Sequence, residues 1–105
     1  MRDLPTALAL LTQRGQTISY GALARQLEIA GPGSIAKLTA ALEALMVEDT
    51  ALGRPLRAAL CHARLAGDLP AQGFFEKAQA LGRFDGTDPA NFVKIERARL
   101  FETAH

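Results

Sequence analysis

The chain contains little cysteine, histidine, tyrosine or tryptophan. It has one cysteine, two histidines, one tyrosine and no tryptophan among its 105 residues. A single cysteine excludes a disulfide within the chain and is typical of a reducing compartment, so we expect a cytoplasmic protein. One cysteine and two histidines do not supply the four ligands of a structural zinc site, so we expect no metal, and we expect no other cofactor.

The sequence also lacks a strong charge of one sign and a long apolar run. Twelve Lys and Arg residues oppose eleven Asp and Glu residues, and the net charge of +1 gives no general attraction to nucleic acid. No apolar run approaches the roughly 18 residues of a membrane-spanning helix, so we expect no membrane association. The N-terminal patch ALALL lacks a small-residue cleavage site, so we do not interpret it as a signal peptide.

What the sequence does contain is a clear set of helix signals in its first half. Asp3 can cap a first helix that ends at Gly15, and residues 16–18 are expected to be extended. Ser19 then caps a second helix, which is expected to end near Glu28. The apolar face of the first helix consists of Leu4, Leu8 and Leu11, and that of the second of Leu23, Ala24 and Leu27.

The third helix completes a predicted helix-turn-helix over residues 19–49. Residues 31–33, Gly-Pro-Gly, make the turn, and the helix is expected to run to about Asp49. Its apolar positions recur at spacings of 3, 4 and 3, which indicates one buried face. These positions are Ile35, Leu38, Leu42 and Leu45.

The second half predicts a small wing and two further helices. Residues 56–65 are interpreted as extended and 66–68 as a turn, so that 56–70 form the wing; a short helix is the alternative, because Ala and Leu favour that state. Residues 73–82 predict a fourth helix, and Asp88 caps a last one whose inner residues are Val93, Leu100, Phe101 and Ala104. The C-terminal helices thus span about 73–104.

These elements predict one domain, residues 1–105, that is mainly α with a small β wing (α+β): a winged helix-turn-helix. Phe74 is expected in its core, and Phe75 either in the core or in a ligand pocket. On the last helix Lys94, Arg97 and Arg99 alternate with Glu96 and Glu102. That alternation favours solvated ion pairs.

Three short segments carry a resemblance to a known group of proteins. Ile18–Ala24 (ISYGALA), Gly53–Pro55 (GRP) and Leu69–Phe75 (LPAQGFF) occur in this order over most of the chain. In these segments the sequence resembles small bacterial winged-helix proteins of unknown function. The resemblance implies the fold and no particular activity.

A second resemblance concerns the alkylguanine-DNA alkyltransferases and their alkyltransferase-like relatives. Their DNA-binding domain has a Ser/Thr-Tyr-Gly-x-Leu-Ala segment like Ser19–Ala24, and their reactive cysteine lies in Pro-Cys-His-Arg, where this chain has Cys61-His62-Ala63-Arg64. Leu60 stands in the place of the proline. The resemblance implies recognition of damaged DNA bases by a degenerate relative.

Cys61 and His62 are the one pair of nucleophile and base in the sequence. Neighbouring residues on a strand point to opposite faces, so His62 is poorly placed to deprotonate Cys61. We therefore interpret Cys61 as a small buried residue and expect no catalytic residue and no enzyme activity.

Candidate contacts to duplex DNA lie in the predicted helix-turn-helix and wing. Tyr20, Ser34 and Lys37 stand near the starts of the second and third helices. The segment 50–67 has three arginines and no acidic residue, and these arginines are Arg54, Arg57 and Arg64. They are expected to contact phosphates, with a solvated rim as the alternative.

We therefore expect a non-enzymatic DNA-binding winged-helix protein. A protein-interaction module on the same scaffold, with a protein partner or as a homodimer, is the main alternative, because the third helix has few basic residues and the fold does not determine the function. The degenerate alkyltransferase-like protein is the other.

Overall fold

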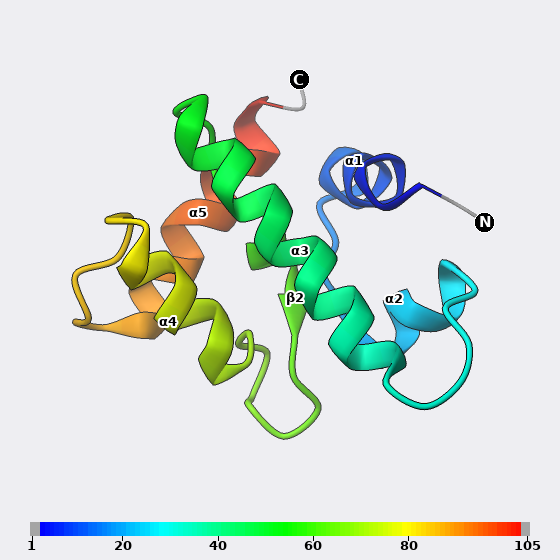
Figure 1. Ribbon diagram of the computed structural model, residues 1–105. Helices are drawn as coiled ribbons and strands as arrows, with labels where there is room; N and C mark the ends of the chain where they lie inside the picture. Colours follow the sequence, from blue (N-terminus) through cyan, green and yellow to red (C-terminus); the bar gives the residue numbers. More distant parts are fainter. Residues whose placement is uncertain (1–2, 104–105) are drawn as a thin grey trace.

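A computed structural model describes residues 3–103, which are mainly helical and contain one small sheet (Figure 1). In chain order the elements are α1 (Leu4–Arg14), β1 (Ile18–Ser19), α2 (Tyr20–Gln26), α3 (Ser34–Ala51), the 3-10 turn η1 (Arg57–Leu60), β2 (Cys61–His62), α4 (Gln72–Ala80) and α5 (Pro89–Thr103). Within this range no helix has both the length and the apolar character needed to cross a bilayer.

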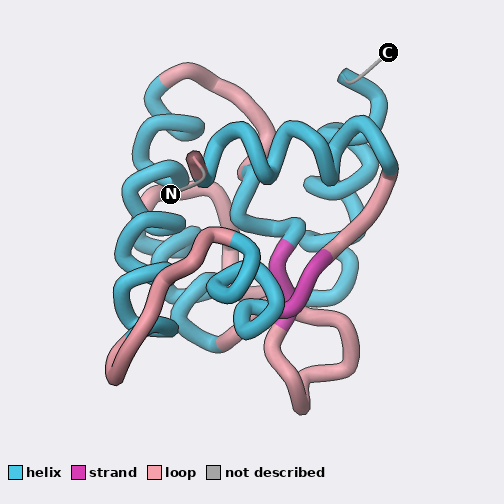
Figure 2. The backbone as a smooth tube through the Cα atoms, turned by 90° about the vertical axis from the view of Figure 1, so that its right-hand side faces the viewer, coloured by secondary structure: helices cyan, strands magenta, loops and turns pink. Residues whose placement is uncertain are grey.

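The sheet consists of two parallel strands that lie side by side near the middle of the molecule (Figure 2). Ile18 is opposite Cys61, and Ser19 is opposite His62. Because α2 begins directly after β1, this pairing brings the chain that follows β2 to the N-terminal end of α2. The mainly helical α+β class is therefore confirmed.

The segment expected to form an extended wing differs from the prediction. Only Cys61 and His62 are in a strand, whereas 57–60 form a 3-10 turn and the turn after the strand begins at Arg64. Ala58, Ala59 and Leu60 are all buried, and three successive residues of a half-exposed strand cannot all face one core. The helical alternative thus applies to 57–60, and the extended interpretation holds for two residues alone.

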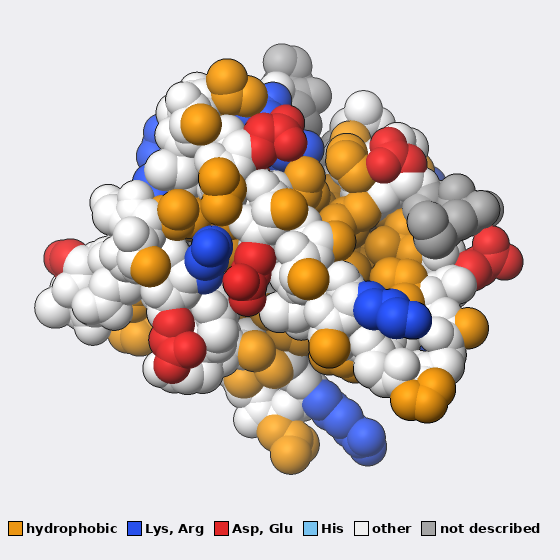
Figure 3. Space-filling model, in the orientation of Figure 1, with side chains coloured by type: hydrophobic (Ala, Val, Ile, Leu, Met, Phe, Trp, Pro, Cys, Tyr) orange, Lys and Arg blue, Asp and Glu red, His pale blue; other side chains and the backbone are white. Residues whose placement is uncertain are grey.

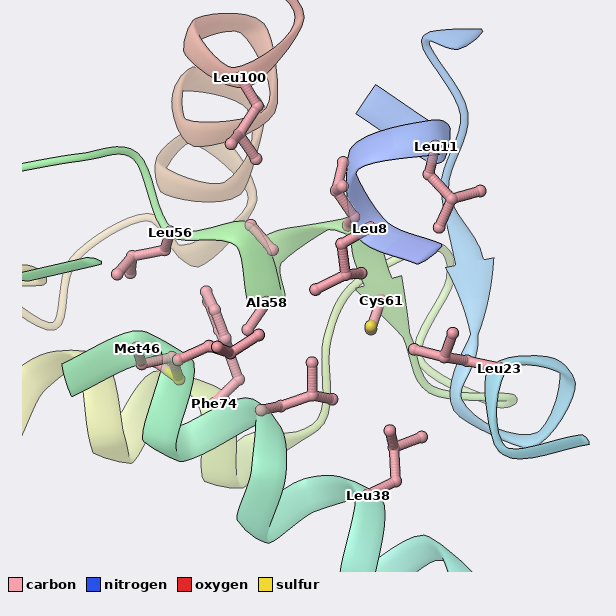
Figure 4. Close-up of a cluster of buried hydrophobic side chains, with 14 of the residues drawn as sticks. Leu8, Leu11, Leu23, Leu38, Met46, Leu56, Ala58, Cys61, Phe74 and Leu100 are labelled. Atoms are coloured by element: carbon pink, nitrogen blue, oxygen red, sulfur yellow. The ribbon is translucent and has the colours of Figure 1, made fainter. Parts of the chain in front are cut away.

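This central segment is the middle of the hydrophobic core. η1 contacts α1, α3 and α5, and each side chain from Leu56 to Cys61 except Arg57 is buried. Figure 4 shows the surrounding residues, which come from every long helix of the described chain. They include Leu8 and Leu11 of α1, Leu23 of α2, Leu38 and Met46 of α3, Phe74 of α4 and Leu100 of α5.

Several local predictions are confirmed. The Ser19 hydroxyl accepts a hydrogen bond from the Ala22 N–H at 3.1 Å, and Asp88 Oδ1 accepts one from the Asn91 N–H at 3.2 Å, so both residues cap their helices. Gly15 ends α1 in the left-handed conformation, with a φ of 64°. The buried sides of the helices contain Leu8, Leu11, Leu23, Ala24, Leu38, Leu42, Leu45, Val93 and Leu100, as expected. Leu27 is buried directly after α2, whereas Leu4 and Phe101 are half-buried.

Other local predictions are wrong in detail. Ile35 was expected on the buried face of α3, but it lies in the first turn of the helix and keeps 44% of its surface exposed. Asp3 precedes α1, but its carboxylate accepts from the Thr6 hydroxyl at 3.0 Å and makes no hydrogen bond to the helix backbone. The helices end at Gln26, Ala51 and Ala80 where about Glu28, Asp49 and Gly82 were expected, and Ala104 lies outside the described residues.

Candidate nucleic-acid interface

Arg54 and Arg57 lie at the C-terminal end of α3, where they surround a buried carboxylate. The Arg57 Nε donates to Asp49 Oδ1 and Oδ2 at 3.0 and 3.1 Å, and the Arg57 backbone N–H donates to Oδ2 at 3.0 Å. Arg54 Nη2 lies 3.4 Å from Asp49 Oδ1 and 3.1 Å from Glu48 Oε1. Asp49 is fully buried. We call these four residues the Asp49 cluster, and in it both arginines are already paired.

A second buried carboxylate, Glu96, contacts the same segment between α3 and η1. Glu96 of α5 is 3% exposed; its Oε1 accepts from the Leu56 N–H at 3.1 Å and from Arg83 Nη2 at 3.0 Å. Arg83 Nη1 in turn donates to the Arg54 carbonyl at 2.9 Å. The chain from 54 to 57 is therefore fixed between two carboxylates, and its arginines belong to this framework.

Arg97 fixes the loop after β2. Its Nε donates to the Ala59 carbonyl at 2.7 Å, and its Nη1 and Nη2 donate to Asp68 Oδ2 and the Asp68 carbonyl at 3.1 and 2.8 Å. The expectation of solvated ion pairs along α5 is therefore wrong for Arg97 and for the buried Glu96. Lys94 and Glu102 are exposed, but neither forms an ion pair within residues 3–103, whereas the Nη1 of the exposed Arg99 lies 3.7 Å from Glu96 Oε2.

Cys61 is a core residue, in agreement with its interpretation from the sequence. Its thiol is fully buried, and burial raises its pKa to about 12, although the charge of Arg97 acts in the opposite direction. His62 is half-buried and follows it on the strand. The thiol therefore stays protonated near neutral pH and lacks the thiolate that a nucleophile needs.

Tyr20 has a structural contact that the sequence did not indicate. Its hydroxyl accepts a hydrogen bond from the Ala71 N–H at 3.1 Å, which ties the start of α4 to the start of α2. The ring is half-buried, and this burial raises the pKa of the hydroxyl. Tyr20 therefore joins two elements of the fold.

The remaining candidates lie at the N-terminal end of α3 and in the loop after β2. Ser34 is the first residue of α3, Lys37 is exposed one turn later, and Arg64 is exposed two residues after β2. Arg25 at the end of α2 is exposed as well. None of these three basic side chains has an acidic partner within residues 3–103. We call Arg25, Ser34, Lys37 and Arg64 the basic end.

The basic end lies at one end of the molecule. The turn before α3 and the loop after β2 are both at the lower end in Figures 1 and 2, whereas the C-terminal end of α3 is at the top. In Figure 3, basic side chains over α2 and over the loop have no acidic side chain between them. The structure thus separates the six predicted contact residues into three groups: Ser34, Lys37 and Arg64 at this end, Arg54 and Arg57 in the Asp49 cluster, and Tyr20 between α2 and α4.

The described part of the chain contains no group of three or more His, Cys, Asp or Glu side chains that could hold a metal ion. The chain matches no protein family, no curated protein sequence and no solved structure.

Proposed function

We propose that this protein is a non-enzymatic DNA-binding domain of the winged-helix type, which grips duplex phosphates with its basic end. The observation that carries the proposal is the pair Lys37 and Arg64. Both side chains are exposed, and neither has an acidic partner among the described residues. The start of α3 and the loop after β2, which carry them, lie at the same end of the molecule (Figure 1). Side chains of this kind release counter-ions when they meet phosphates.

The arrangement of α2, the turn and α3 supports docking through the start of α3. In helix-turn-helix proteins the second helix enters the major groove with its N-terminal residues foremost. The first N–H groups of a helix have no partner within the helix, so phosphate is favoured beside Ser34. The loop that carries Arg64 would contact the neighbouring backbone, as a wing does.

The exposed side of α3 indicates which kind of DNA binding to expect. Beyond Lys37, its exposed residues are mostly apolar: Ile35, Ala36, Ala40, Ala41, Ala44, Val47 and Ala51. Such side chains do not offer the donors and acceptors that distinguish base pairs. We therefore propose binding that depends on phosphates and differs little between DNA sequences.

Fluorescence anisotropy with a labelled duplex, at low and rising salt, tests the proposal. The apparent affinity should fall with salt, and Lys37→Ala and Arg64→Ala should each weaken binding and reduce the magnitude of the salt slope by about 0.9. Arg54→Ala is the matched control, because it removes the same charge from a half-exposed side chain at the opposite end of α3. Equal losses in all three variants, or no binding at low salt, would overturn the proposal.

A protein-interaction role remains the second candidate, because α3 and its C-terminal end expose three large apolar side chains. Ile35, Val47 and Leu52 are 44%, 45% and 61% exposed. Exposed large apolar side chains are typical of a surface that contacts another protein when they form one patch. Sedimentation velocity decides this case: a concentration-dependent dimer without affinity for the duplex would favour the interaction module.

Recognition of damaged bases is the third candidate, and the burial of Cys61 weighs against its chemical version. An alkyl transfer needs a thiolate that can reach its substrate, whereas this thiol is fully buried and has a pKa of about 12. A duplex with one alkylated guanine, added to the same anisotropy series, tests binding without transfer. Tighter binding to that duplex would favour this candidate.

A further inference from the structure

A groove of about 640 Å³ lies between α4 and the loop that follows β2. One wall is a single face of α4, since its members recur at helical spacing: Gln72, Phe75, Glu76 and Gln79. The other wall is the loop, with Leu65, Leu69 and Pro70. The basic end contributes no residue to the lining.

The floor of the groove is aromatic. Phe84 is buried and Phe75 is half-buried, and their ring centroids are 5.6 Å apart with an angle of 53° between the planes. Phe74, the residue before Phe75, belongs to the hydrophobic core and not to the groove. At the rim, Leu65 keeps 95% of its surface exposed, although it lines the groove. An apolar ligand in the groove would cover part of Leu65 and of the Phe75 ring.

A carboxylate is the one charged group of the lining. Glu76 is exposed, and within residues 3–103 it has neither an ion pair nor a side-chain hydrogen bond. Gln72 and Gln79 lie one turn before and after it on the same face of α4, and their amide oxygens can accept hydrogen bonds. The groove therefore combines an aromatic floor with acceptors and a single negative charge.

We propose that this groove binds a small organic ammonium ion with an aromatic or aliphatic body. The volume lies within the range of small-molecule sites, which are mostly apolar with a few placed polar groups. The ammonium group would pair with Glu76, and an aromatic ring such as Phe75 attracts a cation to its face. The body of the ligand would lie between Leu65 and the aromatic floor.

Titration of the 15N-labelled protein with phenethylamine, which is protonated at pH 7, tests this site by NMR. The amide signals of α4 and of residues 63–71 should shift in a saturable manner. The neutral 2-phenylethanol and the anionic 3-phenylpropionate have bodies of similar shape, so the expected order of affinity is amine, then alcohol, then acid. Equal shifts with all three compounds, or shifts outside the groove, would overturn the proposal.

Two carboxylate variants separate the groove from general charge effects. Glu76→Gln should weaken phenethylamine binding by up to about fivefold, which is the upper end of the contribution of an exposed ion pair. Glu102→Gln is the matched control, because Glu102 is also exposed on a helix but does not line the groove. A similar loss in both variants would contradict the assignment to Glu76. No DNA is present in these titrations, so their outcome is independent of the proposed DNA binding.

Discussion

The two ends of α3 carry positive charges that the protein uses in different ways. At the C-terminal end, Arg54 and Arg57 contact the buried Asp49. At the other end, which is about 27 Å away for a helix of 18 residues, Lys37 is exposed and has no acidic partner in the described range. Basic residues in the sequence therefore do not by themselves indicate a binding surface. The difference depends on whether the fold places a carboxylate beside them.

The physical reason for the difference is the environment of Asp49. A fully buried carboxylate loses its hydration, and it is tolerated only when cations and N–H groups replace the lost water. Arg57 supplies a guanidinium and a backbone N–H, and Arg54 adds a second cation. Arg64 and Lys37 neutralise no buried group, so their charges remain available to a ligand from solution.

The largest test of this comparison is the removal of Asp49. Asp49→Ala leaves Arg57 beside a cavity, with only the exposed Glu48 at 3.7 Å from its Nη2, and we expect a loss of about 3–5 kcal/mol in the free energy of unfolding. Urea denaturation followed by circular dichroism measures this loss. Glu48→Ala is the control, because Glu48 is 55% exposed in its side chain and its pairs should contribute less than about 1 kcal/mol. Similar values for both variants would contradict the structural role of the Asp49 cluster.

Cys61 extends the comparison to a buried group without a counter-ion. Because burial raises the pKa of its thiol from 9.0 to about 12, the folded state retains the proton longer than the unfolded chain does. The stability from this thiol is therefore complete below pH 9 and is lost as the pH rises toward 12. From pH 8 to 10.5 we expect a loss of about 2 kcal/mol that Cys61→Ala does not show.

Urea denaturation at several pH values measures this difference between the two proteins. Since every other titratable group is the same in both proteins, the difference isolates Cys61. Parallel pH profiles for the two proteins would show that the thiol titrates normally and is accessible, which would also reopen the question of its reactivity.

Glu96→Gln should have a smaller effect on stability, because glutamine keeps one of the two interactions of Glu96. In Glu96→Gln the amide oxygen still accepts from the Leu56 N–H, but the pairing of a charge with Arg83 is lost. We expect a loss of about 1.5 kcal/mol, within the range for hydrogen bonds to charged groups. Glu102→Gln on the same helix should change the stability by less than about 0.5 kcal/mol, because its side chain is exposed. If the two losses were equal, the pairing of the Glu96 charge with Arg83 would not contribute to the stability of the fold.

The sequence predicts the local features of the fold well, because their signals lie within a few residues. The Ser19 cap, the stripe of Leu38, Leu42 and Leu45, and the Asp88 cap depend on spacings of three or four. The winged-helix assignment itself remains a proposal. The sequence left the course of 57–62 open between a strand and a short helix, because the choice depends on contacts of this segment with distant helices.

The roles of the arginines depend on residues far apart in the sequence, which explains why the predicted site was only partly useful. The Leu56 N–H and Glu96 are 40 residues apart. One signal was nevertheless present. Asp49 continues the spacing of the buried stripe of α3, four residues after Leu45, and an acidic residue at such a position indicates a buried cationic partner nearby. Glu96 likewise lies between Val93 and Leu100 on the buried side of α5.

The smallest expected change in the free energy of unfolding is that of variants in the basic end. Because Lys37 and Arg64 contact no carboxylate of the described chain, Lys37→Ala and Arg64→Ala should each change the free energy of unfolding by less than about 0.5 kcal/mol. Their effects should also add in the double variant, since the two residues share no partner. Arg57→Ala, measured in the same urea series, should lose several times more, because it leaves Asp49 buried without its main cation. If Lys37→Ala were as destabilising as Arg57→Ala, the charged residues at both ends of α3 would stabilise the fold. Lys37 would then not be free to contact DNA, which would contradict the proposed interface.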